Sequence, residues 1–269
     1  MNKYQIGIVG YGVVGKGIHK LFDDEVLAIY DPQKVFTEQI KFKYLDLIVI
    51  SVPTNELSDG TCDTSIVFET LSWIKNIEYK GIVLIKSTTP PTELKRFKEI
   101  FQDLRIVFSP EYMGESKYFT PFWKYPDPQD MRGHTWQIFG GNKADTSICV
   151  DIFQRKMSVD TNFMQTDIVT AGLTKYMENC FFATKVTFCN EFYDIAKKLG
   201  VDYNELRECW LADPRLNRNH TLVFSRERGY GGKCFPKDLK GIIKDAETLG
   251  YSADLLKAVN FVNEKIRND

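Results

Sequence analysis

The amino-acid sequence predicts an α/β protein, in which a doubly wound parallel sheet is followed by an all-helical domain with a long central helix. Three observations predict this class. Short apolar runs alternate with helical patterns as far as about residue 163, which is typical of parallel sheets. The first of these runs ends in a glycine-rich turn. From about residue 164 onward the pattern is helical, so we expect two domains, 1–163 and 164–269.

The strands of the first domain are predicted from apolar runs bounded by turn residues, because strands buried on both faces are apolar throughout. The helices between them are predicted from apolar residues three and four positions apart, and Pro90 and Pro91 favour a helix start. The expected strands are Tyr4–Val9, Val26–Tyr30, Leu45–Val52, Ile82–Lys86, Arg105–Phe108, Thr135–Phe139 and a short one near Ser158–Thr161; the expected helices are Lys16–Phe22, Thr64–Asn76, Thr92–Phe101 and Ala144–Arg155.

The second domain begins with a helix expected from about Asp167 to Leu199, which ends before Gly200 as helices commonly do. A shorter helix is expected from near Asn204. Another is expected to start at Pro236 and reach Leu249, and the last runs from about Ala253 to Arg267.

Composition excludes several classes of function. The chain has 269 residues, 43% of them hydrophobic, and a formal net charge of −1, so a nucleic-acid partner has no electrostatic support. Six cysteines without a CxxC pair, together with only three histidines, predict thiols of a reducing compartment and no metal site. The sequence shows no apolar run of membrane-spanning length and no signal peptide, so we expect a cytoplasmic protein without a membrane partner.

The first strand leads into Gly10-Tyr11-Gly12-Val13-Val14-Gly15, and the second ends at Asp31. This is the Rossmann-type dinucleotide-binding fingerprint. Gly10 allows the tight turn, Gly12 lets a pyrophosphate approach the backbone and Gly15 allows close helix packing, with Val13 and Val14 beside the cofactor. A carboxylate at Asp31 accepts hydrogen bonds from ribose hydroxyls and repels a 2′-phosphate, so NAD is predicted over NADP.

Polar side chains follow several strands of the predicted sheet. Pro53 and Thr54 follow the third strand, Thr88 follows the fourth, and Glu111 and Glu115 follow the fifth. Ligands of such sheets bind at the carboxyl ends of the strands. The sequence therefore predicts a site along this edge. No role is predicted for the aromatic, proline-rich segment from Phe119 to His134.

A third candidate feature is the segment Gly229–Asp238, which places a thiol among glycines and charged groups. Cys234 lies between Lys233 and Lys237, and neighbouring cations favour the reactive thiolate. Asp238 can hold a water molecule or relay a proton. On the long helix, Lys175 and Asn179 are four residues apart and so share one face, where they can stabilise an oxyanion.

Taken together, these segments resemble the UDP-glucose/GDP-mannose dehydrogenase family. The shared motifs are GYGVVG, SVPTN, KSTTPP, SPEYMGES, the lysine- and asparagine-containing helix, DPR and GYGGKCFPKD, and they occur in family order across nearly the whole chain. The resemblance implies NAD-dependent oxidation of a nucleotide-sugar primary alcohol to a carboxylate. SPEYMGES resembles the UDP-glucose branch more than the GDP-mannose branch.

The resemblance also implies roles for single residues. Cys234 would capture the aldehyde and form a thioester, while Lys175 and Asn179 would stabilise the oxyanion or hold water. Asp238 and Thr88 would position that water, and Glu111 would assist thioester hydrolysis. Further residues would bind cofactor or substrate: Pro53, Thr54, Glu115 and Lys237 on the cofactor side, and Tyr112, Arg215, Tyr230 and Gly231 on the substrate side, with Arg215 reaching across a dimer interface.

The chain departs from the family pattern in several places. The family's third, C-terminal nucleotide-binding domain has no counterpart in these 269 residues. The segment between Asp31 and Leu45 is short, Gly172 stands where the family has a glutamate, and Thr89 and Thr92 replace a valine and a glycine. Three extra residues lie between Arg215 and Cys234.

Two other functions remain open at this stage. One is an NAD-dependent hydroxyacid dehydrogenase of similar layout, which needs the lysine but not the cysteine. The other is a non-catalytic module that binds NAD or forms a homodimer through the central helix. The presence of Cys234 together with Lys175, Asn179 and Asp238 favours the nucleotide-sugar dehydrogenase.

Overall fold

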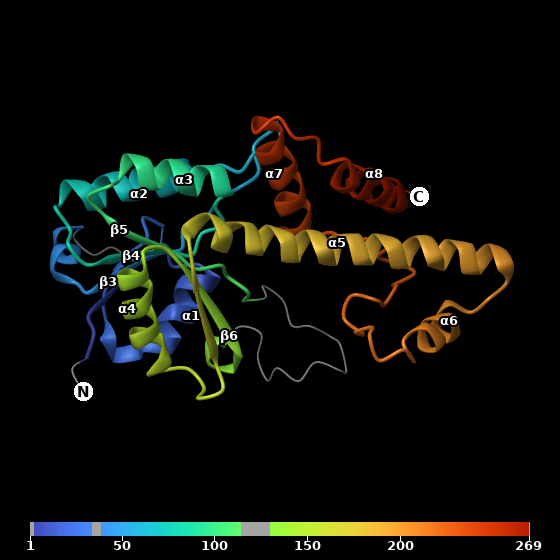
Figure 1. Ribbon diagram of the computed structural model, residues 1–269, viewed down its shortest axis with the longest axis horizontal. Helices are drawn as coiled ribbons and strands as arrows, with labels where there is room; N and C mark the ends of the chain where they lie inside the picture. The colour runs from blue at the N-terminus through green and yellow to red at the C-terminus, as the bar shows by residue number, and fades with distance from the viewer. Residues whose placement is uncertain (1–2, 34–38, 114–129, 269) are drawn as a thin grey trace. The chain divides into compact units, whose positions relative to one another are not determined.

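The computed structural model describes residues 3–33, 39–113 and 130–268 (Figure 1). Its sheet has seven strands in the order β2-β1-β3-β4-β5-β6-β7. The strands are β1 Ile6–Val9, β2 Val26–Tyr30, β3 Leu47–Ile50, β4 Ile82–Ile85, β5 Arg105–Phe108, β6 Trp136–Gly140 and β7 Asn162–Thr166. Every neighbouring pair is parallel except β5 and β6, so the predicted fold class is confirmed with one antiparallel pairing.

The order in which successive strands are added to the sheet reverses at β1, because β2 pairs with one side of β1 and β3 pairs with the other. In open α/β sheets a ligand crevice forms where the strand order reverses, outside the carboxyl ends of the strands. The glycine turn after β1 and the Pro53-Thr54 segment after β3 both follow strands that meet at this point.

Helices cover both faces of the sheet, as expected for a doubly wound fold. The helices of this part are α1 Val13–Phe22, α2 Ser65–Asn76, α3 Pro91–Ile100 and α4 Lys143–Gln154. One core cluster contains Leu71 of α2 and Phe97 of α3, and the other contains Phe22 of α1 and Phe153 of α4. The described ranges also contain three short 3-10 helices, at Asp23–Glu25, Gln39–Tyr44 and Met131–Gly133.

The expected last strand is displaced along the chain. Ser158–Thr161 forms a turn in which the Thr161 amide donates to the Ser158 carbonyl at 3.0 Å, and Val159 is fully exposed. The strand itself is Asn162–Thr166, whose Phe163 packs against the α1–α4 side of the core. Pairing with β6 therefore decided its position, rather than the short apolar pattern before it.

The remaining part is helical, as predicted. Its helices are α5 Ile168–Leu199, α6 Tyr203–Trp210, α7 Cys234–Thr248 and α8 Asp254–Asn268. Helix α5 has 32 residues and so extends about 48 Å at 1.5 Å per residue. Helix α7 begins two residues earlier than expected, so Cys234 is its first residue and Pro236 lies within its first turn, where proline is tolerated.

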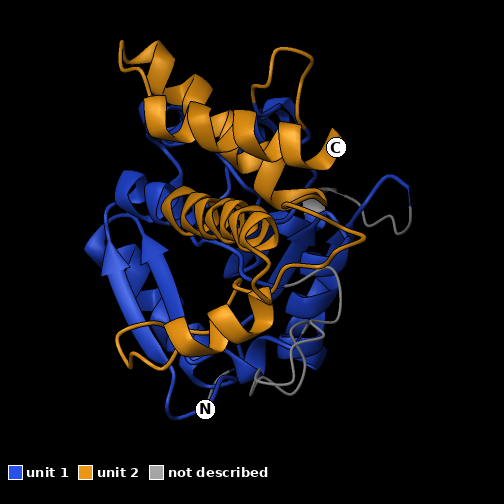
Figure 2. Cartoon of the chain, turned by 90° about the vertical axis from the view of Figure 1, so that its right-hand side faces the viewer, with its two compact units in different colours: residues 1–55, 62–175 blue, residues 56–61, 176–269 orange. Residues whose placement is uncertain are grey.

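Two compact units divide the chain, residues 1–55 with 62–175 and residues 56–61 with 176–269 (Figure 2). This division passes through helix α5, between Lys175 and Tyr176. The functional boundary expected after residue 163 stays a prediction. In the part of the chain that the structure describes, no helix has both the length and the apolar character required to cross a membrane.

Candidate functional site

The glycine turn after β1 has the close packing that the fingerprint predicts. Gly10 adopts φ 89°, a left-handed conformation that favours glycine. A Cβ at Gly15 would lie 2.1 Å from the Gly10 carbonyl oxygen, whereas a Cβ at Gly12 would meet no heavy atom within 4 Å. Gly10 and Gly15 are therefore required by the fold itself, and Gly12 leaves open space beside the backbone.

Helix α1 starts directly after Gly12 and presents its N-terminus at this space. No side chain caps it, and its first turn, which contains Val13 and Val14, has no acidic residue. The first backbone N–H groups of a helix lack intrahelical partners and favour a bound anion. This end of α1 therefore fits the pyrophosphate of a dinucleotide.

Asp31 lies against the same turn, although it is 16 residues beyond Gly15 in the sequence. Its Oδ2 accepts a hydrogen bond from the Tyr11 amide at 2.8 Å, and its Oδ1 accepts one from the Gln33 amide at 3.0 Å. The carboxylate is thus held beside the glycine turn, where the fingerprint places the ribose of the cofactor. Together the turn, the helix N-terminus and Asp31 fit a dinucleotide.

The ends of β3 and β4 lie side by side because these strands pair. Pro53 is exposed and Thr54 is buried after β3, while Thr88 is half-buried after β4. The Cys62 thiol contacts both ends, with its sulfur 3.9 Å from the Thr54 carbonyl oxygen and 3.7 Å from that of Thr88. Sequence reasoning missed Cys62, since nothing in its local pattern indicates this contact.

Glu111 lies after β5 in a buried polar environment. Its Oε2 is 3.2 Å from Nζ of Lys86, and its Oε1 accepts from the Tyr112 and Met113 amides at 2.8 and 2.7 Å. Burial by itself would raise the pKa of this carboxyl, but the Lys86 ammonium and the Met113 amide outweigh burial and hold the pKa below its usual range. Glu115, also predicted for this site, lies outside the described residues, as does most of the Phe119–His134 segment.

Lys175 lies above the ring of Tyr112, with Nζ 4.8 Å from the ring centroid. Tyr112 in turn contacts Trp136 of β6, with ring centroids 5.3 Å apart. A cation over an aromatic face is attracted to it. The structure thus brings the predicted residues Glu111, Tyr112 and Lys175 to one region of the first unit.

In the second unit, three predicted residues meet at the start of α7. Asn179 of α5 donates from Nδ2 to Oδ2 of Asp238 at 2.6 Å, and Lys237 Nζ is 2.6 Å from Oδ1. Asp238 is 2% exposed and Asn179 5% exposed, so this is a buried carboxylate with two partners. Cys234 is exposed at the first position of the same helix, where the helix dipole favours a thiolate.

The predicted substrate residues before α7 are held by helix α8. The backbone N–H of Tyr230 donates to Oδ1 of Asn263 at 2.7 Å, and the side-chain Nδ2 of Asn263 donates to the Tyr230 carbonyl at 3.0 Å. A Cβ at Gly231 would lie 2.7 Å from Nη1 of Arg267. Arg215 is 86% exposed and forms an ion pair with Asp213, so it does not join the others.

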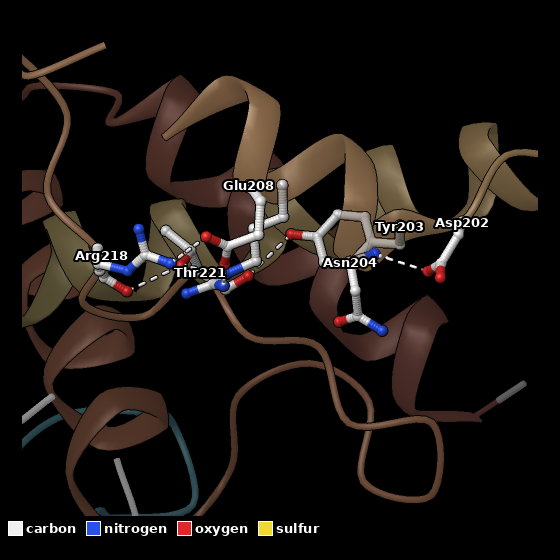
Figure 3. Close-up of polar contacts among 7 residues, drawn as sticks. Asp202, Tyr203, Asn204, Glu208, Arg218 and Thr221 are labelled. Atoms are coloured by element: carbon white, nitrogen blue, oxygen red, sulfur yellow. Dashed lines mark hydrogen bonds and ion pairs between the residues drawn. The ribbon is translucent and has the colours of Figure 1, made fainter. Parts of the chain in front are cut away.

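Contacts with α6 hold the first part of the segment that leads to Cys234, as Figure 3 shows. The Tyr203 hydroxyl donates to the Thr221 carbonyl at 2.8 Å, and Nε of buried Arg207 donates to Oγ1 of Thr221, also at 2.8 Å. Arg218 of the loop forms an ion pair with Glu208 of α6. Sequence reasoning missed this network because the residues joined across the loop are 10 to 18 positions apart.

Metal ligands are not gathered anywhere in the described ranges, where no group of three or more His, Cys, Asp or Glu side chains could hold a metal ion. The six cysteines all lie in these ranges, and no two of them form a disulfide. The roles of the individual site residues stay predictions.

Two family models match the chain. Residues 28–126 match the NAD binding domain of the UDP-glucose/GDP-mannose dehydrogenase family, and residues 169–265 match its central domain. These matches indicate NAD as the cofactor.

Individual relatives agree with the family models. The chain is similar to UDP-glucose 6-dehydrogenase of Rickettsia bellii, with 31% identity over 254 residues that cover 87% of this chain and 56% of the relative. It is 28% identical over 226 residues to that of Rickettsia prowazekii, covering 81% of this chain and 49% of the relative. The chain therefore spans about half the length of the curated relatives it matches.

A solved structure shares the fold. The structure of a UDP-glucose dehydrogenase from Pyrobaculum islandicum matches 98% of this chain and 68% of its own, with a TM-score of 0.79 and 24% identity.

Proposed function

The chain belongs to the UDP-glucose/GDP-mannose dehydrogenase family, and from this premise we propose that it oxidises a nucleotide-sugar primary alcohol to the carboxylate with NAD. UDP-glucose is the proposed substrate, because the relatives from Rickettsia are UDP-glucose 6-dehydrogenases. The observation that carries this proposal is the buried Asn179–Asp238–Lys237 contact at the start of the helix that begins with Cys234. A hydroxyacid dehydrogenase has no use for this thiol.

We assign separate roles to the two domains predicted from the sequence. Residues 1–163 bind NAD through the glycine turn, α1 and Asp31, and residues 164–269 carry the cysteine and the dimer surface. Two NAD molecules, bound one after the other, would each supply a nicotinamide ring that accepts one of the two hydrides. Pro53, Thr54, Thr88 and Glu115 are proposed to line the cofactor side of the site.

The proposed reaction uses Cys234 as a covalent trap. After the first hydride leaves the alcohol carbon, the thiolate adds to the aldehyde carbon and forms a thiohemiacetal. Loss of a second hydride from that carbon gives a thioester. Water then adds to the thioester carbonyl, the C–S bond breaks with release of the Cys234 thiolate, and the acid product leaves.

The other residues are proposed to support this chemistry. Lys175 and Asn179 stabilise the oxyanions, since preorganised donors are most effective where charge develops. Asp238 and Thr88 position water, and Glu111 accepts its proton. Further residues are proposed to contact cofactor or substrate, namely Lys237, Tyr112, Arg215, Tyr230 and Gly231.

A homodimer through α5 is a separate part of the proposal. Several large apolar side chains of this helix are exposed, at spacings of three, four and seven residues: Met177, Phe181, Phe188, Phe192, Ile195 and Leu199. Such spacing places them along one side of a helix, and an apolar surface of this kind marks an interaction site. Phe181→Glu with Phe188→Glu should convert a dimer into a monomer in light scattering, whereas Met164→Glu, also at an exposed position, should not.

The central test measures the number of NADH molecules formed per molecule of sugar nucleotide. The protein is mixed with NAD and a limiting amount of UDP-glucose, with GDP-mannose in parallel, and we expect about two NADH per sugar. Cys234→Ser should abolish the second oxidation, whereas Cys209→Ser, at another exposed cysteine, should leave it unchanged. One NADH per substrate regardless of Cys234 would support the hydroxyacid dehydrogenase. NAD binding without turnover of either sugar nucleotide would support the non-catalytic module.

A further inference from the structure

Lys86 is a lysine with no exposed side-chain surface, placed directly after β4. Its Nζ lies 3.2 Å from Oε2 of Glu111 and 3.2 Å from Oγ of Ser109, and Ser109 is itself fully buried. Burial of a charged ammonium costs several kcal/mol unless it is paired and hydrogen-bonded. The position therefore depends on its partner, Glu111.

Glu111 is held from two sides. Lys86 approaches Oε2, while Oε1 accepts from two consecutive backbone amides, those of Tyr112 and Met113. Two amide hydrogen bonds to Oε1 and an ammonium 3.2 Å from Oε2 together hold the carboxylate in one orientation. Among the described residues Oε2 is buried and has no hydrogen-bond partner beyond its ion pair with Lys86, so this oxygen keeps the capacity to accept a proton.

Stability does not explain the ion pair. Replacement of a buried ion pair by apolar residues of similar volume is often neutral or stabilising. The pair is better explained by what it does to Glu111.

Among the described residues, two cationic or titratable groups face Glu111 from the elements packed around it. Lys86 comes from the end of β4, and His134, which precedes β6 and is 5% exposed, adds a weaker favourable effect. Burial acts in the opposite direction, yet the pKa of the Glu111 carboxyl remains below its usual range. Lys86 makes the largest favourable contribution.

We propose that Lys86 is a positioning residue whose ammonium orients Glu111 and preserves its charge, so that this carboxylate accepts the proton of the water that hydrolyses the thioester. The proposal rests on the function proposed above. In this step the water oxygen bonds to the thioester carbon, its proton passes to Glu111, and the C–S bond breaks with release of the thiolate.

The decisive experiment does not require turnover. Protein labelled with ¹³C at glutamate carboxyl carbons is titrated by NMR, and the Glu111 signal is assigned by its loss in Glu111→Gln. In Lys86→Met the Glu111 midpoint should rise by about 1 to 3 pH units, the range set by one adjacent opposite charge. Lys86→Arg should restore most of the shift, and Lys98→Met, at an exposed position on α3, should cause none. An unchanged midpoint in Lys86→Met would overturn the proposal.

A second measurement applies if Lys86→Met does not fold. In the wild-type protein labelled with ¹⁵N at lysine Nζ, the Lys86 signal should shift at the same pH at which Glu111 titrates. A Lys86 chemical shift that stays constant through the pH range in which Glu111 titrates would overturn the proposal as well.

Turnover gives an independent readout. In Lys86→Met the acid limb of the pH–rate profile should move up by the same interval as the Glu111 midpoint, with the KM for NAD unchanged. A wild-type protein without turnover would contradict the proposed function, while the NMR titrations would still decide the role of Lys86.

Discussion

Asn179→Asp tests whether Asn179 and Asp238 form the buried contact on which the proposed site depends. In the structure, Nδ2 of Asn179 is 2.6 Å from Oδ2 of Asp238, and both side chains are at least 95% buried. The substitution replaces this donor with a second carboxylate. Two like charges about 4 Å apart repel by about 4 kcal/mol at an effective dielectric constant of about 20.

This repulsion has a defined pH dependence. A cost of about 4 kcal/mol corresponds to about 3 pKa units at about 1.36 kcal/mol each, so the introduced carboxyl should have its pKa raised from about 4 when unfolded to about 7 when folded. Below about pH 4 the group is protonated in both states and can still donate to Asp238. As the pH rises from about 4 to 7 the unfolded state loses this proton first, so the folded state loses stability relative to the wild type.

The assay is urea unfolding, followed by far-UV circular dichroism at several pH values between 4.5 and 7.5. The variant's deficit in the free energy of unfolding should grow by about 3 to 4 kcal/mol across this interval. The matched control is Asn190→Asp on the same helix, where Asn190 is 1% exposed and its Oδ1 accepts from Nε of Arg228 at 2.7 Å. A carboxylate there gains a cation, so its deficit should not grow with pH. A deficit for Asn179→Asp that is equal at pH 4.5 and 7.5 would refute the reasoning.

Three further predictions concern the cofactor turn and the second unit. Gly15→Ala should lower the melting temperature, because its Cβ would lie 2.1 Å from the Gly10 carbonyl oxygen. Gly12→Ala should fold normally, because a Cβ at this position meets no heavy atom within 4 Å. The same variant should bind NAD more weakly in calorimetry. Asp31→Ser should reduce the preference for NAD over NADP in the same assay, and equal preferences in wild type and variant would contradict the role of Asp31. Burial, with a smaller effect of Lys185, lowers the pKa of His220 from 6.5 to about 4, so this histidine contributes stability above about pH 6.5 that is lost as the pH falls toward 4. In His220→Asn, which tolerates the positive φ of this position, the loss of melting temperature between pH 7 and 4.5 should be smaller than in the wild type.

Much of the fold was predictable because its signals are local. Buried parallel strands are continuous apolar runs, and the glycine fingerprint requires residues at fixed spacing because each glycine has a steric role. The structure confirms the α/β class, the helical second part and the 32-residue helix α5. Errors occur where tertiary pairing outweighs the local pattern, as in the antiparallel β5–β6 pair and the position of β7.

The candidate site likewise has residues that could be predicted from the sequence and contacts that could not. The candidate residues of the glycine turn, Asp31, and Cys234 with its neighbouring lysines could be identified without a structure, because each lies within a short motif. By contrast, the burial of Lys86 against Glu111, the contact of Cys62 with the ends of two strands and the hydrogen bonds between Asn263 and Tyr230 follow from the folded arrangement alone. These contacts join residues 8 to 33 positions apart, and their existence depends on burial and strand order, which the packing of the whole fold produces and no short stretch of sequence encodes.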